Sequence, residues 1–143
     1  MCPILILPLL SGIVAQTAKL FIKVNKTKFS FKNMVAYSGM PSGHSAMVIS
    51  LSTITGLKLG CESPVFAFSV ILAIIVIRDA LGIRRYLGQH GKTLNILVKD
   101  LKEDEFLDEK YPKLLEHIGH TPLQVLAGGL IGFIISLIGY FLI

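Results

Sequence analysis

Four long apolar segments constrain this chain more than any other feature of its sequence. They cover residues 3–22, 45–59, 64–83 and 121–143. At 1.5 Å per residue, an apolar helix of roughly 20 residues spans the hydrocarbon core of a bilayer, which is about 30 Å thick. The second segment is shorter and reaches that length only if the preceding Ser-Gly-His extends it, or if it is tilted or sheltered by its neighbours. The sequence therefore predicts an all-α integral membrane bundle of about four transmembrane helices.

The composition agrees with a membrane protein of one domain. The chain has 143 residues, of which 52% are hydrophobic and 16% charged, whereas about 25% of the residues in soluble domains are charged. We expect a single domain over residues 1–143. The first segment lacks the basic start and cleavage site of a signal peptide, so we expect a retained helix. Cys2 and Cys61 lack metal-ligand spacing and are expected to be two ordinary thiols, with a disulfide bridge as the alternative.

The basic residues predict the orientation of the bundle. Four helices place the loops at residues 23–43 and 84–120 on one side of the membrane, and Lys58 on the other. The two loops hold eleven basic residues: Lys23, Lys26, Lys28, Lys32, Arg84, Arg85, Lys92, Lys99, Lys102, Lys110 and Lys113. By the positive-inside rule this side is cytoplasmic and both termini lie outside, in a bacterial-type plasma membrane. The net charge of +5 then reflects topology and anionic lipid headgroups, and indicates no nucleic-acid partner.

The second basic loop contains a further helical pattern. Leu94, Leu97, Val98 and Leu101 recur at helical spacing, and acids and lysines follow over residues 99–109. This pattern predicts a cytoplasmic amphipathic helix that lies against the membrane surface or the bundle, followed by a solvated stretch.

Polar residues gather at the predicted cytoplasmic ends of the four helices. In chain order they are Gln16, Lys19, Ser42, Gly43, His44, Arg78, Asp79, Arg84, Arg85, Gly119 and His120. Two helix N-termini and several cations thus meet on one side. Free amide groups and the positive end of the helix dipole favour anions there, so we expect a phosphate site.

Several of these residues also have purely structural interpretations. Ser42 is a suitable N-cap, and the TPLQ sequence at residues 121–124 fits a capping box. Lys19 suits a side chain that extends toward the membrane surface. Arg78 and Asp79 are able to neutralise one another. Capping and ligand binding are compatible, so both interpretations stay open here.

Three sequence blocks resemble a known family. "GMPSGHSA" (39–46), "RDALGIRR" (78–85) and "LEHIGHTPLQVLAGGLIG" (115–132) are similar to motifs of the type-2 phosphatidic acid phosphatase superfamily. That superfamily includes lipid phosphatases, acid phosphatases and vanadium haloperoxidases. The match is closest to its divergent branch of small membrane proteins and extends from about Gln16 to Gly132.

The resemblance implies a two-histidine mechanism without metal or cofactor. His120 corresponds to the nucleophile that forms a phosphohistidine, and His44 to the acid that protonates the leaving oxygen. Lys19, Ser42 and the Gly43 amide correspond to the groups that hold the phosphate. An imidazole suits both roles because it is nucleophilic and titrates near neutral pH.

The chain also departs from the family pattern in the first and the third motif. Lys26-Thr27 stands where the first motif has Arg-Pro, and Leu114 stands where the third has an arginine. We expect Arg84 and Arg85, helped by Arg78, to replace that arginine. Gln124 occupies the position of the acid that orients the nucleophile; glutamine can accept an imidazole N–H but supplies no charge. Asp79 is the candidate for supplying it.

Three functions from different classes follow. The first is a phosphatase acting on a lipid phosphomonoester such as phosphatidylglycerophosphate or phosphatidic acid, or on a polyprenyl diphosphate if the topology is reversed. The second is a non-catalytic lipid-binding or assembly protein, which Leu114 and Gln124 favour. The third is a small transporter, indicated only by the serines and threonines of the second apolar segment. The expected partners are a lipid phosphate, membrane lipids and a second copy in a homodimer.

Overall fold

A computed structural model describes residues 3–22, 39–100, 114–116 and 118–142. Its helices are α1 (Pro3–Phe21), α3 (Gly43–Leu59), α4 (Pro64–Leu81), α5 (Ile83–Asp100) and α7 (Pro122–Leu142). The described part of the chain contains no strand, so the predicted all-α class is confirmed. The helices begin and end within a few residues of the predicted apolar segments, because Ser42 caps α3, Pro64 begins α4, and Gly60 and Gly82 end α3 and α4.

Three helical stretches of the described residues are long and apolar enough to cross a membrane. They are Pro3–Phe21, Pro64–Lys99, which joins α4 to α5, and Pro122–Leu142. Helix α3 has 17 residues and does not reach that length. The structure therefore establishes three candidate spans, and the predicted number of four is not confirmed.

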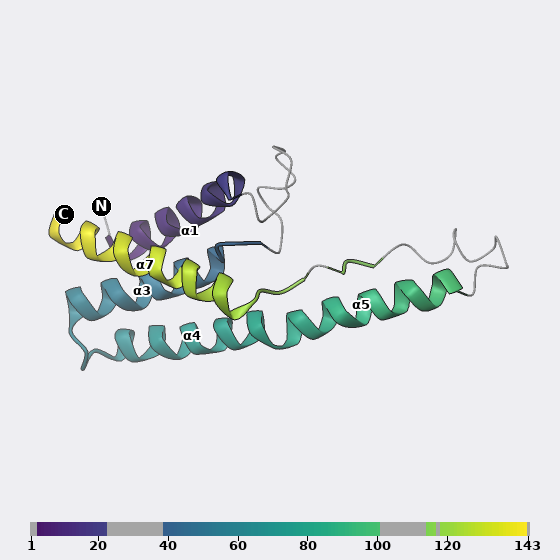
Figure 1. Cartoon of the computed structure of the whole chain (residues 1–143). Helices are drawn as coiled ribbons and strands as arrows, with labels where there is room; N and C mark the ends of the chain where they lie inside the picture. Colours follow the sequence, from purple (N-terminus) through teal and green to yellow (C-terminus); the bar gives the residue numbers. More distant parts are fainter. Residues whose placement is uncertain (1–2, 23–38, 101–113, 117, 143) are drawn as a thin grey trace.

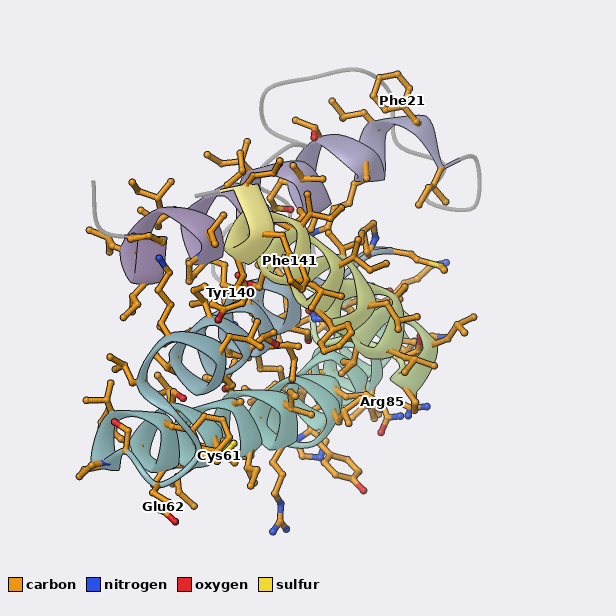
Figure 2. The ribbon with its side chains drawn as sticks, turned by 90° about the vertical axis from the view of Figure 1, so that its left-hand side faces the viewer. Phe21, Cys61, Glu62, Arg85, Tyr140 and Phe141 are labelled. Carbon is orange, nitrogen blue, oxygen red and sulfur yellow. The ribbon has the colours of Figure 1, made fainter. Side chains whose placement is uncertain are left out.

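Helix α3 occupies the centre of the bundle and packs against α1, α4 and α7. Figure 2, seen from the end that carries Cys61 and Glu62, places α1 and α4 on opposite sides of α3. Figure 1 shows that α1 starts and α7 ends at this same end of the bundle. At the opposite end of the bundle lie the end of α1, the start of α3, the end of α4 and the start of α7. We call this opposite end the site end.

Glycines let α7 approach the backbone of α3 directly. A Cβ atom on Gly128 would overlap the carbonyl oxygen of Ser42, and one on Gly132 would overlap that of Ala46. Both glycines are buried. Close backbone approach through small residues is how membrane helices gain packing energy without a hydrophobic driving force. Gly128 and Gly132 therefore act as packing residues between α3 and α7.

Buried hydroxyl groups join the helices in the body of the bundle. Ser50 Oγ and Ser136 Oγ lie 2.6 Å apart and link α3 to α7, and Thr55 Oγ1 and Ser69 Oγ lie 2.9 Å apart and link α3 to α4. Ser11 Oγ of α1 donates to the Ala46 carbonyl oxygen of α3 at 3.1 Å. Ser50 and Thr55 belong to the apolar segment on which the transporter hypothesis rested, and they act here in contacts between helices.

The predicted amphipathic helix is present, but it begins earlier than the pattern indicated. Helix α5 starts at Ile83, one residue after the break at Gly82 (φ −103°, ψ −96°). Helix α5 continues the direction of α4 and projects past the other helices (Figure 1). It therefore does not lie against the bundle. The apolar side chains of Leu94 and Leu97 are exposed.

Candidate active site

Backbone hydrogen bonds hold the converging segments together at the site end. Ser42 N donates to the Gln124 carbonyl oxygen at 3.0 Å and joins the start of α3 to α7. His120 N donates to the Ala80 carbonyl oxygen at 3.1 Å and joins the segment before α7 to the end of α4. The gathering of these helix ends, expected from the sequence, is therefore a property of the fold.

The start of α3 is capped as predicted. Ser42 is fully buried, and its Oγ accepts from Ser45 N at 3.4 Å and from Ser45 Oγ at 3.0 Å. The first amide groups of any helix lack partners within the helix, and the dipole places partial positive charge on them. Gly43 and His44, the first two residues of α3, therefore present amides suited to an anion.

The conformation of the backbone before α7 fixes the position of His120. Gly119 has φ +90°, a conformation that residues with a side chain rarely adopt. A Cβ at Gly119 would lie 2.6 Å from Arg85 N, so this segment crosses directly over the start of α5. The turn directs the His120 ring into the protein, where the residue is only 4% exposed.

The His120 ring is neutral at neutral pH and makes no hydrogen bond. Neither Nδ1 nor Nε2 has a hydrogen-bond partner among the residues that the structure describes, although both atoms are buried. Burial, followed by the charges of Lys19, His44 and Arg84, lowers the pKa of His120 from 6.5 to about 4. One ring nitrogen therefore carries a free lone pair at pH 7, as a nucleophile requires.

The two histidines differ in their access to solvent. His120 is buried, whereas His44 is exposed although it lies in the first turn of a central helix. An exposed imidazole exchanges protons with water readily, and a buried neutral one keeps its lone pair. This difference matches the division of roles that the family resemblance implies.

Lys19 is the buried cation of the site. It lies in the last turn of α1 and is 4% exposed, so it does not extend to the surface as the structural alternative supposed. Gln16 lies one turn before it, with Oε1 buried and without a hydrogen-bond partner.

The basic residues after α4 do not all take the expected positions. Arg84 Nε donates to Asp79 Oδ2 across the Gly82 break, so Asp79 pairs with Arg84 and not with Arg78. Arg78 is exposed, and Arg85 is exposed at the surface seen in Figure 2. Arg84 alone of the three lowers the pKa of His120, which makes it the better replacement for the missing arginine.

Gln124 closes the predicted capping box. Thr121 N donates to Gln124 Oε1 at 2.9 Å, and Gln124 N donates to Thr121 Oγ1 at 3.4 Å. The box leaves Gln124 Oε1 engaged with backbone, and the His120 nitrogens have no hydrogen-bond partner. In this structure Gln124 therefore orients the start of α7 and not the imidazole.

A side-chain clamp on α5 was missed by the sequence reasoning. Asn95 Nδ2 donates to the Leu114 carbonyl oxygen and to Glu116 Oε1, and Leu114 N donates to Asn95 Oδ1, each at 2.9 Å. A Cβ on Gly88 would lie 2.6 Å from the Glu116 carbonyl oxygen. The sequence signal for this contact was the helical spacing of Gly88, Gly91 and Asn95, which lie on one face of α5. The two glycines leave room there for the backbone of another segment.

The search for metal-ligand clusters and for a disulfide extends only over the described ranges. They contain no group of three or more His, Cys, Asp or Glu side chains that could hold a metal ion. Cys61 is a free, exposed thiol, and Cys2 lies outside the residues that the structure describes. The basic loop at residues 23–38 lies outside them as well.

Comparisons with known proteins agree with the resemblance. The model of a family described as the divergent PAP2 family matches residues 2–135. An uncharacterized membrane protein of Bacillus subtilis (strain 168), YuiD, is 38% identical over 145 residues, which cover 92% of each chain. No solved structure matches significantly.

Proposed function

The chain belongs to the divergent PAP2 family, and from this premise we propose that it is a membrane phosphatase. It hydrolyses a lipid phosphomonoester through a phosphohistidine on His120. The substrate is of the phosphatidylglycerophosphate or phosphatidic acid type, and the site faces the cytoplasm of a bacterial-type plasma membrane.

One observation carries this proposal. His120 is a buried neutral imidazole with both ring nitrogens unbonded, next to the positive charges of Lys19 and Arg84. Unpaired polar atoms in a protein interior cost about 1–3 kcal/mol each and call for an explanation. A nucleophile beside a phosphate cradle explains both the free nitrogens and the cations.

The first half of the reaction forms the phosphohistidine. A ring nitrogen of His120 attacks phosphorus as the bond from phosphorus to the lipid oxygen breaks. Protonated His44 donates its proton to that oxygen, and the lipid alcohol leaves. Lys19 and the first amides of α3 stabilise the charge on the transferring phosphoryl group.

The second half returns the enzyme to its starting state. Neutral His44 accepts a proton from a water molecule whose oxygen attacks phosphorus. The bond between phosphorus and the His120 nitrogen breaks, phosphate leaves, and His120 regains its lone pair. The sum is one ester and one water converted into one alcohol and one phosphate.

Phosphate release by the purified protein in detergent tests the proposal. Phosphatidylglycerophosphate, phosphatidic acid and a polyprenyl diphosphate are presented in parallel, without added metal. We expect turnover of a phosphomonoester, and its loss in His120→Ala and in His44→Ala. His90→Ala is the matched control, because His90 is an exposed histidine of α5. A folded protein that releases phosphate from none of the lipids would overturn the proposal.

A second function has an observation in its favour. Gln124, which stands in the place of the orienting acid, is engaged in the capping box, so no acceptor fixes the His120 ring. A non-catalytic lipid-binding or assembly protein on the same scaffold would need no oriented nucleophile. Lipid-phosphate binding without turnover, equal in wild type and His120→Ala, would identify this function.

A further inference from the structure

Gln16 places a carbonyl acceptor beside the donors at the start of α3. Its Oε1 is buried and accepts no hydrogen bond. Its side chain lies against the first residue of α3: Cδ is 3.3 Å and Nε2 3.5 Å from the position that a Cβ on Gly43 would occupy. The absence of a side chain at Gly43 therefore makes room for this amide beside the anion-binding turn.

The chemistry of the neighbours defines what Gln16 is able to bind. Lys19 lies one turn along the same face of α1, and the first amides of α3 present N–H groups. These donors suit phosphate oxygens. A carbonyl oxygen repels an anionic phosphate oxygen, so Gln16 Oε1 needs an O–H group of the ligand close to, but not part of, the ionised phosphate.

We propose that Gln16 Oε1 accepts a hydrogen bond from a hydroxyl group that the substrate carries next to its phosphate ester. This inference rests on the proposed phosphatase function and narrows it to phosphomonoesters of lipids with a free neighbouring hydroxyl. Phosphatidylglycerophosphate belongs to that class, because its terminal glycerol keeps one hydroxyl beside the phosphate. Phosphatidic acid does not, because both neighbouring oxygens are acylated.

A matched pair of lipids tests the hydroxyl alone. One is a lysophosphatidate with a free hydroxyl beside the phosphate-bearing carbon, and the other is its analogue with hydrogen in place of that hydroxyl. At pH 8, where the phosphate itself carries no O–H, we expect wild-type kcat/KM to favour the hydroxyl lipid about tenfold, the size of one net hydrogen bond. Gln16→Met removes the acceptor and should bring the ratio near one.

Two further variants separate recognition from folding. Gln16→Glu keeps an acceptor oxygen, so the preference should persist while its charge lowers the turnover of both lipids. Thr17→Val is the control on the same helix, because the Thr17 hydroxyl bonds only to carbonyl oxygens of its own helix in the described structure. Its ratio should equal that of the wild type.

Several outcomes would overturn the inference. Equal wild-type turnover of the two lipids would do so, as would an equal loss on both in Gln16→Met, which would indicate a role in holding water or the fold. A loss on both lipids in Gln16→Met that appears only at acid pH would assign the O–H group to the phosphate, which the two lipids share. If wild type releases no phosphate from either lipid, nor from phosphatidylglycerophosphate or phosphatidic acid, the phosphatase proposal fails. Affinity then tests the role of Gln16: tenfold tighter binding of the hydroxyl lipid supports it, and equal binding refutes it.

Discussion

In the body of the bundle, buried hydroxyls such as Ser50, Thr55, Ser69 and Ser136 bond across the helix interfaces. At the site end, the buried side-chain atoms of the described residues that lack partners are Gln16 Oε1 and the two ring nitrogens of His120. Both regions bury polar groups in the same small bundle. The comparison shows that α3 belongs to two different regions. In the body of the bundle the buried hydroxyls are hydrogen-bonded between helices, whereas at the site end buried polar atoms are left available for a ligand.

The largest expected effect comes from removing the buried cation of the site end. Lys19→Met should lower kcat/KM by about 300-fold, or about 3 kcal/mol, because one fixed charge on the transferring phosphoryl group is lost. Lys58→Met is the control at the opposite end, where Lys58 is exposed. Steady-state kinetics in detergent measure both variants. Equal losses in the two would erase the distinction between the ends.

Acid should weaken the site end through His120. Its folded pKa of about 4 lies below the ordinary 6.5, so the folded state binds the proton less readily than the unfolded state. The stabilising contribution is complete above pH 6.5 and is lost as the pH falls to 4, by up to about 3 kcal/mol. The difference in unfolding free energy between wild type and His120→Ala, followed from pH 7 to 4 in mixed micelles, measures it. A difference that does not change with pH would contradict the buried neutral ring.

Overpacking should damage the body of the bundle instead. Gly132→Ala introduces a Cβ that overlaps the Ala46 carbonyl oxygen and should lower the unfolding free energy by about 2 kcal/mol. Gly129→Ala is the control on the same helix, because its Cβ would meet Ile49 Cγ1 at an ordinary 3.5 Å. Thermal unfolding in detergent compares them. Similar melting temperatures for the two variants would show that α7 does not need this close approach.

The smallest effect concerns a single hydroxyl contact. Ser136→Ala removes the two bonds that Ser136 Oγ makes with Ser50, one to Oγ and one to the carbonyl oxygen. It should cost about 1 kcal/mol of unfolding free energy, at about 0.6 kcal/mol for each bond between membrane helices. Turnover should stay at the wild-type level. Thr53→Val is the control, because Thr53 Oγ1 bonds within its own helix at 2.8 Å. A large loss of activity in Ser136→Ala would mean that the hydroxyls of the bundle body belong to the site.

Much of the fold follows from local sequence. The apolar runs at residues 45–59 and 64–83, with the cap at Ser42, predict the helix ends to within a few residues, because caps act locally. The break at Gly82 lies inside the second of these runs and was not predicted. The convergence of polar groups follows from counting helix ends on one side of a membrane. The helix ends depend on short stretches of sequence, and the side on which each end lies depends on successive helices crossing the membrane in alternate directions. Both can be inferred from the sequence.

The remaining features depend on contacts between distant segments. His44 and His120 both follow a glycine and precede Ser or Thr, yet one is exposed and the other buried, because burial depends on the neighbouring helices. The pairing of Asp79 with Arg84 needs the break at Gly82 to bring their side chains together. The Asn95 clamp joins residues 19 positions apart or more, and no local pattern specifies its partner.

Because of the Asn95 clamp, the position of His120 does not depend on the length of the connection that precedes Leu114. Asn95 holds the backbone at Leu114, and Gly119 seats the chain on the start of α5. Contacts with α5, and not residues 101–113, therefore fix the position of the chain from Leu114 to His120. An epitope or reporter inserted between Asp100 and Leu114 should therefore leave the position of His120 unchanged.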